Sequence, residues 1–283
     1  MILEYKEFLT IFNKVLKNTT EEINYELLVK LIKEPKRYIG IFRLTNPQTK
    51  LLQNLSQSRE IKLGYAIEEL FTYYIEKLNF KNLNKNIGLA EDGNTLMADQ
   101  IFEMTETNTI YLIEQKMRDD HDSTKKRGQI QNFEKKINLL SELYPDKTIK
   151  AFMWFIDPTA QRKNQKYYKT EIEKLTNERI ETNLYYGKEL FLSIFENDLI
   201  WNEIITYIEK YKEENQYRFN IVNFDEDILG FEILKKIKLE EPNLFKKLLY
   251  SKKEEYILLR KYFFPTNKNF KKIDLKYKEK IKC

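Results

Sequence analysis

The stretch that decides the fold runs from Leu96 to Gln129 and reads LMADQIFEMTETNTIYLIEQKMRDDHDSTKKRGQ. Residues 109–117 are rich in β-branched and aromatic side chains and contain no Gly or Pro, which is typical of a β-strand. Residues 96–104 are interpreted as the preceding strand, and the polar segment 105–108 is short enough to be a hairpin turn. The stretch therefore predicts a β-hairpin, followed by a charged loop that leads into a helix.

Alternation of side chains along residues 109–117 places Glu114 and Lys116 on one face of the strand and Gln115 on the other. Both faces begin with apolar residues, so we expect the strand to be buried on both sides. A buried Glu and a buried Lys need compensation, because uncompensated charge in a low-dielectric interior is costly.

The register of the hairpin predicts which charged residues meet. If the hairpin is symmetric about Glu106 and Thr107, Asp99 lies opposite Glu114, with Lys116 one step further along the same face. Directly opposed carboxylates repel each other unless a positive charge lies between them. Mg²⁺ is commonly held by one or two carboxylates, so this arrangement predicts a Mg²⁺ site, with Mn²⁺ as an alternative ion.

The sequence Ala98-Asp99, followed by Glu114-Gln115-Lys116, resembles the motif of the PD-(D/E)xK nucleases, with Ala98 where the family has Pro. The resemblance implies that Asp99, Glu114 and the main-chain carbonyl of Gln115 bind the metal. It also implies that Lys116 orients or activates the attacking water. The alternative interpretation is a solvated hairpin with a surface ion pair.

Two further site residues follow from the same resemblance. The helix before the hairpin often supplies an additional Glu in this family, and Gly64-x-x-x-Glu68 resembles that feature; an ordinary surface Glu is the alternative. The helix after the hairpin often carries a Gln or Lys near the scissile phosphate, which implies a catalytic role for Gln129. We expect Asp122 or Ser123 to cap that helix.

The order of predicted elements over residues 60–195 resembles the αβββαβ core of the nuclease family. The expected fold class is α/β, with an α+β type of mixed sheet, a PD-(D/E)xK nuclease core and helical additions at both ends. We expect a helical region at 1–60 with a role in DNA recognition, the nuclease core at 61–214, and a basic, mostly helical region at 215–283. The expected elements are helices at 62–78 and 124–144 and strands at 86–90, 96–104, 109–117, 148–157 and 182–186. Residues 18–22 are a credible helix start, and the polar segment 43–62 suits a solvated loop and a short helix, with side chains for DNA contact as the alternative. In the helix at 124–144, we expect one apolar face made by Ile130, Phe133, Ile137 and Leu140.

The distribution of charge suits a polyanionic partner. The chain has a net charge of +5, and residues 233–283 carry 16 Lys/Arg against 6 Asp/Glu. Such a basic segment is typical of proteins that contact nucleic acid, although a solvated helical surface has the same composition. The candidate DNA-binding residues are Arg43, Lys50, Arg59, Lys125, Lys126, Arg127, Gln161, Arg162 and Lys163.

Several classes of protein are excluded by composition. Cys283 is the only cysteine and His121 the only histidine, so intrachain disulfides, cysteine zinc sites and paired-histidine metal sites are ruled out. No glycine-rich phosphate-binding motif is present. We see neither a signal peptide nor an apolar run of membrane-spanning length, and expect a soluble protein of the bacterial cytoplasm.

Segments 58–68 and 119–129 look like those of a subgroup of type II restriction endonucleases. The resemblance implies a type II site-specific deoxyribonuclease that hydrolyses double-stranded DNA at a short sequence by Mg²⁺-assisted attack of water. It also implies a homodimer on a palindromic target and a cognate DNA methyltransferase as genetic partner. The alternatives are a repair or structure-specific nuclease of the same fold, a non-enzymatic DNA-binding module on an inactive nuclease scaffold, and an interaction protein in which the motif residues form only a structural ion pair.

Overall fold

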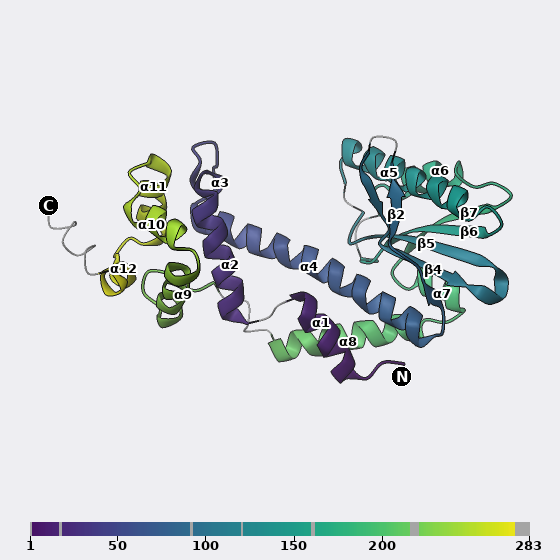
Figure 1. The fold of residues 1–283 in the computed structure, drawn as a ribbon, viewed down its shortest axis with the longest axis horizontal. Helices are drawn as coiled ribbons and strands as arrows, with labels where there is room; N and C mark the ends of the chain where they lie inside the picture. Colours follow the sequence, from purple (N-terminus) through teal and green to yellow (C-terminus); the bar gives the residue numbers. More distant parts are fainter. Residues whose placement is uncertain are drawn as a thin grey trace. The chain divides into compact units, whose positions relative to one another are not determined.

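The computed structural model describes residues 2–16, 19–90, 93–119, 121–159, 162–215 and 221–274. The chain divides into two compact units, each assembled from two separate segments (Figure 1). Unit 1 comprises Met1–Val15 and Lys62–Tyr211, and unit 2 comprises Leu16–Ile61 and Lys212–Cys283. The functional roles predicted for the segments 1–60, 61–214 and 215–283 stay predictions.

Unit 1 contains a five-stranded mixed sheet with the strand order β1-β4-β5-β6-β7. The strands are β1 (Lys81–Asn82), β4 (Gln100–Met104), β5 (Thr109–Lys116), β6 (Thr148–Phe155) and β7 (Ile180–Tyr186). Strands β1, β4 and β5 pair antiparallel, whereas β5, β6 and β7 pair parallel. The predicted α/β class with a mixed sheet and helical flanks is therefore confirmed.

The hairpin of β4 and β5 has the predicted register. Gln100 pairs with Ile113 at one end of the ladder, and Met104 pairs with Thr109 at the other. The turn is a short 3₁₀ helix, Thr105–Thr107, closed by Asn108 in the left-handed conformation (φ 51°), which Asn tolerates better than most residues. Continuing this register by one residue brings Asp99 opposite Glu114.

The predicted strand 96–104 is not continuous, and this expectation was wrong. Its first part is β3 (Thr95–Met97), which pairs with β2 (Asn86–Leu89) in a separate two-stranded sheet. The chain leaves that sheet at Ala98, whose N–H donates to the carbonyl of Lys85 (2.8 Å). The expectation that residues 86–90 form the first strand of the core sheet was wrong for the same reason, since β1 holds the edge position beside β4.

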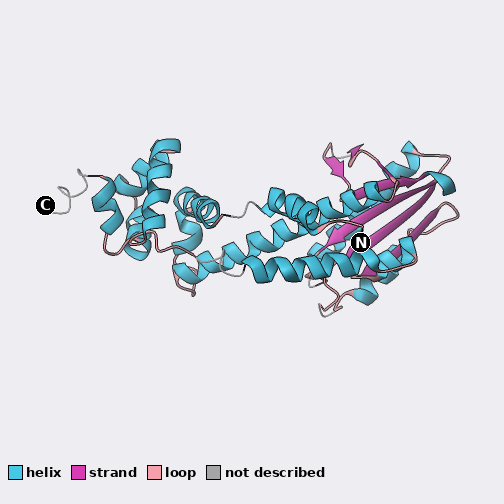
Figure 2. Ribbon diagram, turned by 90° about the horizontal axis from the view of Figure 1, so that it is seen from below, coloured by secondary structure: helices cyan, strands magenta, loops and turns pink. Residues whose placement is uncertain are grey.

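Helices cover both faces of the five-stranded sheet in unit 1 (Figure 2). They are the second part of α4 (Pro47–Lys77), α5 (Ser123–Leu143), α6 (Gln165–Glu173), α7 (Glu189–Phe195) and α8 (Leu199–Asn215). Helix α1 (Tyr5–Leu16) packs on α8, where the rings of Phe8 and Tyr207 are in contact. One face packs Ile110 and Leu112 against α5 and α6. On the other face, rings from α4, α7 and α8 contact Trp154 of β6.

Helix α5 follows the sequence prediction closely. Asp122 is its N-cap, and one side-chain oxygen accepts hydrogen bonds from the main-chain N–H groups of Thr124 and Lys125. The expected apolar face is buried, and its members are Ile130, Phe133, Ile137 and Leu140. This face fixes the rotation of α5 over the sheet, and so determines which polar side chains of the helix reach β5.

Helix α4 is longer than predicted. A loop and a short helix were expected over residues 43–62, but one helix begins at Pro47 and continues to Lys77. Proline is tolerated in the first turn of a helix. The Gln, Lys and Arg side chains that suggested a solvated loop are good helix formers, so this polar composition does not oppose the helix.

Unit 2 is helical. It contains the first part of α4 together with α2 (Thr20–Lys33), α3 (Pro35–Ile39), α9 (Ile228–Glu240), α10 (Pro242–Tyr250), α11 (Glu254–Phe263) and α12 (Lys268–Ile273). Its core joins residues distant in sequence, such as Leu28 and Leu234. Helix α2 begins with a reciprocal capping box between Thr19 and Glu22, at the predicted helix start. Among the described residues, no helix meets the length and hydrophobicity that crossing a bilayer requires.

Two helical glycines should respond in opposite directions to substitution by alanine. A Cβ at Gly128 in α5 meets no atom within 4 Å, so Gly128→Ala should raise the free energy of unfolding by about 1 kcal/mol through helix propensity. A Cβ at Gly230 in α9 would lie 2.7 Å from the carbonyl oxygen of Asn223, so Gly230→Ala should lower it by roughly 1–3 kcal/mol. Urea unfolding followed by circular dichroism measures both, and equal signs would contradict the packing described around Gly230.

Candidate active site

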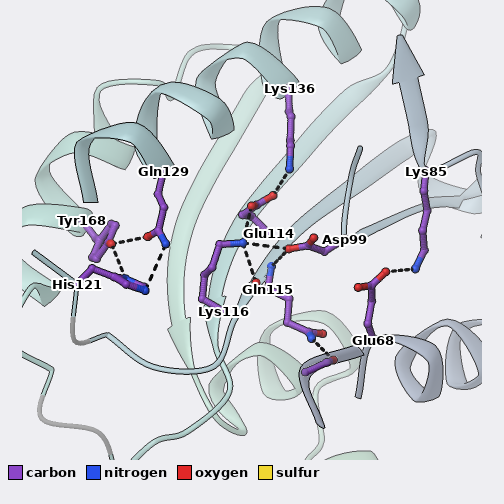
Figure 3. Close-up of polar contacts among 11 residues, drawn as sticks. Glu68, Lys85, Asp99, Glu114, Gln115, Lys116, His121, Gln129, Lys136 and Tyr168 are labelled. Carbon is purple, nitrogen blue, oxygen red and sulfur yellow. Dashed lines mark hydrogen bonds and ion pairs between the residues drawn. The ribbon is translucent and has the colours of Figure 1, made fainter. Parts of the chain in front are cut away.

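The predicted motif residues meet around the side-chain nitrogen of Lys116 (Figure 3). Lys116 Nζ lies 2.6 Å from Glu114 Oε1, 2.9 Å from the carbonyl oxygen of Gln115 and 3.3 Å from Asp99 Oδ2. These are the three oxygen donors predicted to bind a metal. The hairpin register thus brings two carboxylates and one carbonyl to the ammonium group of Lys116.

The two carboxylates differ in their access to solvent. The side chain of Asp99 is 26% exposed, and its Oδ2 accepts the main-chain N–H of Gln115 at 2.7 Å. That hydrogen bond ties the residue preceding β4 to the end of β5. The side chain of Glu114 is only 5% exposed, because it lies in the buried central strand. Asp99 can therefore be reached from outside, whereas Glu114 is held inside.

Lys136 is a charged member of this cluster that the sequence analysis missed. Its Nζ, carried by α5, lies 2.5 Å from Glu114 Oε2, and its side chain is 4% exposed. The signal was present in the helix periodicity: Lys136 comes three residues after Phe133 and four before Leu140, within the buried stripe of α5. A lysine at such a position needs a buried anion, and Glu114 supplies it.

The electrostatics of the cluster separate the two acids. Burial raises the pKa of Asp99, and the neighbouring charge of Glu114 raises it further. Burial would also raise the pKa of Glu114, but Lys116 and Lys136 together outweigh burial and hold it below the ordinary value. Burial opposes the charge of Lys116 as well, yet the two carboxylates outweigh this and raise its pKa. At neutral pH, Glu114 is therefore a carboxylate and Lys116 an ammonium group.

Glu68 lies close enough to Asp99 for their charges to interact. Burial raises the pKa of Glu68, Lys85 opposes this increase, and the charge of Asp99 adds to it. Glu68 Oε1 accepts a hydrogen bond from Lys85 Nζ at 2.6 Å, and its main-chain carbonyl accepts one from the side chain of Gln100. A metal-binding role for Glu68 stays a prediction.

Gln129 belongs to a different group of side chains. Tyr168 donates its hydroxyl hydrogen to Gln129 Oε1 (2.6 Å), Gln129 Nε2 lies 3.4 Å from His121 Nε2, and His121 Nδ1 lies 3.3 Å from the Tyr168 hydroxyl. These contacts form a closed ring in which each residue can donate once and accept once, provided that neutral His121 carries its proton on Nδ1. The predicted catalytic role of Gln129 is untested by this arrangement.

The basic residues predicted to contact DNA occupy several surfaces. Lys125 and Arg127 are exposed on the first turns of α5, and Lys126 donates to Asn164 Oδ1 (3.1 Å) and lies over the ring of Tyr167. Arg162 pairs with Glu189, and Lys163 is exposed. Arg43 is exposed, whereas Lys50 and Arg59 are half-buried, all three in unit 2. Gln161 lies outside the described residues. All nine assignments stay predictions.

The donor set around Lys116 suits a hard divalent cation. Carboxylate and carbonyl oxygens are the ligands that Mg²⁺ and Mn²⁺ prefer, and these three already converge on a positively charged group. In the part of the chain that the structure describes, no cluster of three or more His, Cys, Asp or Glu side chains could hold a metal ion. A cation here would thus have two carboxylates and one carbonyl, with its remaining positions open to water and phosphate oxygens.

A family model described as "Type II restriction endonuclease, HinfI" matches residues 6–90 and 84–212 of the chain. The matched region includes every residue of the Asp99, Glu114 and Lys116 cluster, together with Lys136. No curated protein and no solved structure matches the chain significantly.

Substitution of the two acids should change stability in opposite directions. In Asp99→Asn, the amide oxygen can still accept the N–H of Gln115 while a buried like charge is removed, so the melting temperature should rise by about 2–4 °C for each kcal/mol gained. Glu114→Gln leaves Lys136 buried without its counter-charge and should lower the free energy of unfolding by about 3–5 kcal/mol. Both variants are measured in EDTA at neutral pH.

The effects of the two substitutions on stability should depend on pH in different ways. Because the pKa of Asp99 is raised, its ionisation destabilises the fold, so the advantage of Asp99→Asn should be present at neutral pH and vanish as the pH falls through that pKa. The contribution of Glu114 should be full above the ordinary carboxyl pKa and decline as the pH falls through its lowered pKa. Parallel pH profiles for the two variants would contradict the assigned electrostatics.

Proposed function

The chain belongs to the HinfI family of type II restriction endonucleases, and on that premise we propose that it hydrolyses phosphodiester bonds of double-stranded DNA at a short specific sequence, using Asp99, Glu114 and Lys116. The observation that carries this proposal is the meeting of two carboxylates, a carbonyl and an ammonium group at the ends of adjoining strands. The succession of α4, the antiparallel strands, α5 and β6 supports assignment of the core to the PD-(D/E)xK type.

We assign the metal-binding role to Asp99, Glu114 and the Gln115 carbonyl, with Mg²⁺ as the physiological ion and Mn²⁺ as a substitute. When bound, such an ion polarises a phosphate oxygen and lowers the pKa of a water ligand, in the best cases from about 15.7 to about 7. Glu114 is suited to permanent ligation because its lowered pKa keeps it ionised. Asp99 is suited to capture the ion from solvent because its side chain is partly exposed.

Lys116 acts as a charged donor in this proposal. Its raised pKa keeps the side chain protonated at neutral pH, so it does not accept a proton from water in its resting state. Its three N–H donors are directed at Glu114, Gln115 and Asp99 in the structure. A metal ion bound to those oxygens would release the donors, which could then hold a water molecule and a phosphate oxygen. The positive charge of Lys116 stabilises the negative charge that develops on the phosphate in the transition state.

The first turns of α5 offer a place for the DNA backbone. The helix N-terminus carries partial positive charge, and the exposed Lys125 and Arg127 add to it. These residues follow the loop that leaves β5 after Lys116, so the chain itself connects the backbone contacts to the cluster. Contacts of this kind position DNA without reading its sequence.

Two partners follow from the proposed activity. A palindromic target would be bound by a homodimer, because the two-fold symmetry of the protein matches that of the site. A nuclease that recognises a short sequence would also cut the DNA of its own cell. A cognate methyltransferase acting on the same sequence would prevent this.

Cleavage of a mixed-sequence plasmid in Mg²⁺ tests the proposal. The wild-type chain should produce discrete fragments, and Lys116→Ala should cut about 10²–10³-fold more slowly, because it removes the charged donor proposed to stabilise the phosphate. The variant should still bind the DNA in a gel-shift assay. Lys150→Ala is the matched control, since Lys150 forms an ion pair with Glu181 at the β6–β7 pairing and has no proposed catalytic role.

The pattern of products decides between the candidate activities. Discrete bands from wild-type protein support recognition of a specific sequence. A smear, or cutting confined to branched DNA, would favour a repair or structure-specific nuclease. Sequence-preferring binding without cleavage in Mg²⁺ or Mn²⁺ would favour a non-enzymatic DNA-binding module, and full activity of Lys116→Ala would remove Lys116 from the mechanism.

A further inference from the structure

We propose that Lys136 determines which divalent cation the site prefers, by occupying Glu114 Oε2 and leaving only Oε1 for a metal. This inference rests on the metal-binding role proposed above for Glu114. It assigns Lys136 as a positioning residue, since the lysine acts through the carboxylate rather than on the substrate. The preference expected from this arrangement is for Mg²⁺ over Ca²⁺.

The two oxygens of Glu114 are paired with lysines of very different exposure. Oε1 lies 2.6 Å from Lys116 Nζ, and Oε2 lies 2.5 Å from Lys136 Nζ (Figure 3). The side chain of Lys116 is 24% exposed, whereas that of Lys136 is 4% exposed. Lys116 can therefore move towards solvent and release Oε1. Lys136 cannot move to solvent in the same way, because breaking its contact with Oε2 would leave an unpaired charge buried inside unit 1.

The packing of α5 explains why Lys136 keeps its position. The helix is held against the sheet by the buried side chains of Phe133, Ile137 and Leu140, which flank Lys136 in sequence. Glu114 is equally fixed, since it lies in β5 between β4 and β6. The contact between Lys136 and Oε2 thus joins two rigid elements.

The number of oxygens that a carboxylate offers distinguishes the two cations. Ca²⁺ takes six to eight oxygen ligands and often binds both oxygens of one carboxylate, whereas Mg²⁺ requires a near-ideal octahedron and retains several waters. A glutamate that offers only one oxygen is sufficient for Mg²⁺, but it provides too few oxygen ligands for Ca²⁺. The charge of Lys136 weakens the binding of both dications, so this repulsion largely cancels in the ratio of their affinities.

The test is the ratio of Ca²⁺ to Mg²⁺ affinity of the metal-free full chain, measured without DNA by calorimetric titration and by cation-dependent melting temperature. Lys136→Met removes the charge and the hydrogen-bond donor, so the ratio should shift towards Ca²⁺ by about tenfold. Lys136→Gln keeps a neutral donor and should shift the ratio in the same direction by a smaller factor. This second variant carries the test alone if Lys136→Met does not fold.

Lys147→Met is the matched control. Lys147 pairs with Glu103, a largely buried carboxylate on β4 of the same sheet, and has no place in the proposed site. The control should lose stability while its ratio of Ca²⁺ to Mg²⁺ affinity stays at the wild-type value.

The outcomes separate this inference from the proposed function. An unchanged ratio in both Lys136 variants, with wild-type protein that binds cations, would show that Lys136 is purely structural and would overturn the inference alone. Wild-type protein that binds neither cation would overturn the proposed metal site and the inference together. A shifted ratio in the Lys136 variants, with no shift in Lys147→Met, is the expected result.

Discussion

The structure of unit 1 depends on one buried carboxylate, Glu114, and on the two lysines that neutralise it. An ionised glutamate in a central strand is costly unless charge and hydrogen bonds compensate it. Lys116 comes from the same strand and Lys136 from α5, so the ion pair with Lys136 joins the helix to the sheet. The apolar stripe of α5 sets the rotation of the helix, and this rotation delivers Lys136 to Oε2. Packing and electrostatics therefore specify the same arrangement.

The second carboxylate reaches the cluster because the chain changes sheets just before it. Strand β3 ends at Met97, and β4 begins at Gln100, which leaves Asp99 outside both ladders. Its side chain can then accept the N–H of Gln115 and lie beside Lys116. Partial exposure follows from the same break. Glu114 is buried and ionised, whereas Asp99 is partly buried and has a raised pKa. This asymmetry is created by topology rather than by residue type.

The sequence predicted the hairpin and its register because side chains on paired strands alternate with a fixed period, so one turn position determines every pairing. It also predicted the α5 cap and its buried face. It did not predict the break at Ala98, which depends on a hydrogen bond to Lys85 thirteen residues earlier. Lys136 was not predicted because lysine is usually solvated, and only its spacing from Phe133 and Leu140 places it on the buried face of α5. The placement of Gln129 with His121 and Tyr168 depends on tertiary packing that local patterns do not encode.

Ala98 lies where the nuclease motif that the sequence resembles has proline, and the structure gives a physical reason for the alanine. The N–H of Ala98 donates to the carbonyl of Lys85, and proline has no N–H to donate. Lys85 in turn holds Glu68 through its ammonium group. A proline at position 98 would thus remove the hydrogen bond that anchors the main chain of Lys85, the residue whose side chain pairs with Glu68. The alanine is compatible with the metal-binding chemistry proposed here, because that chemistry uses the side chain of Asp99 and requires only that the chain turn into β4 at this point.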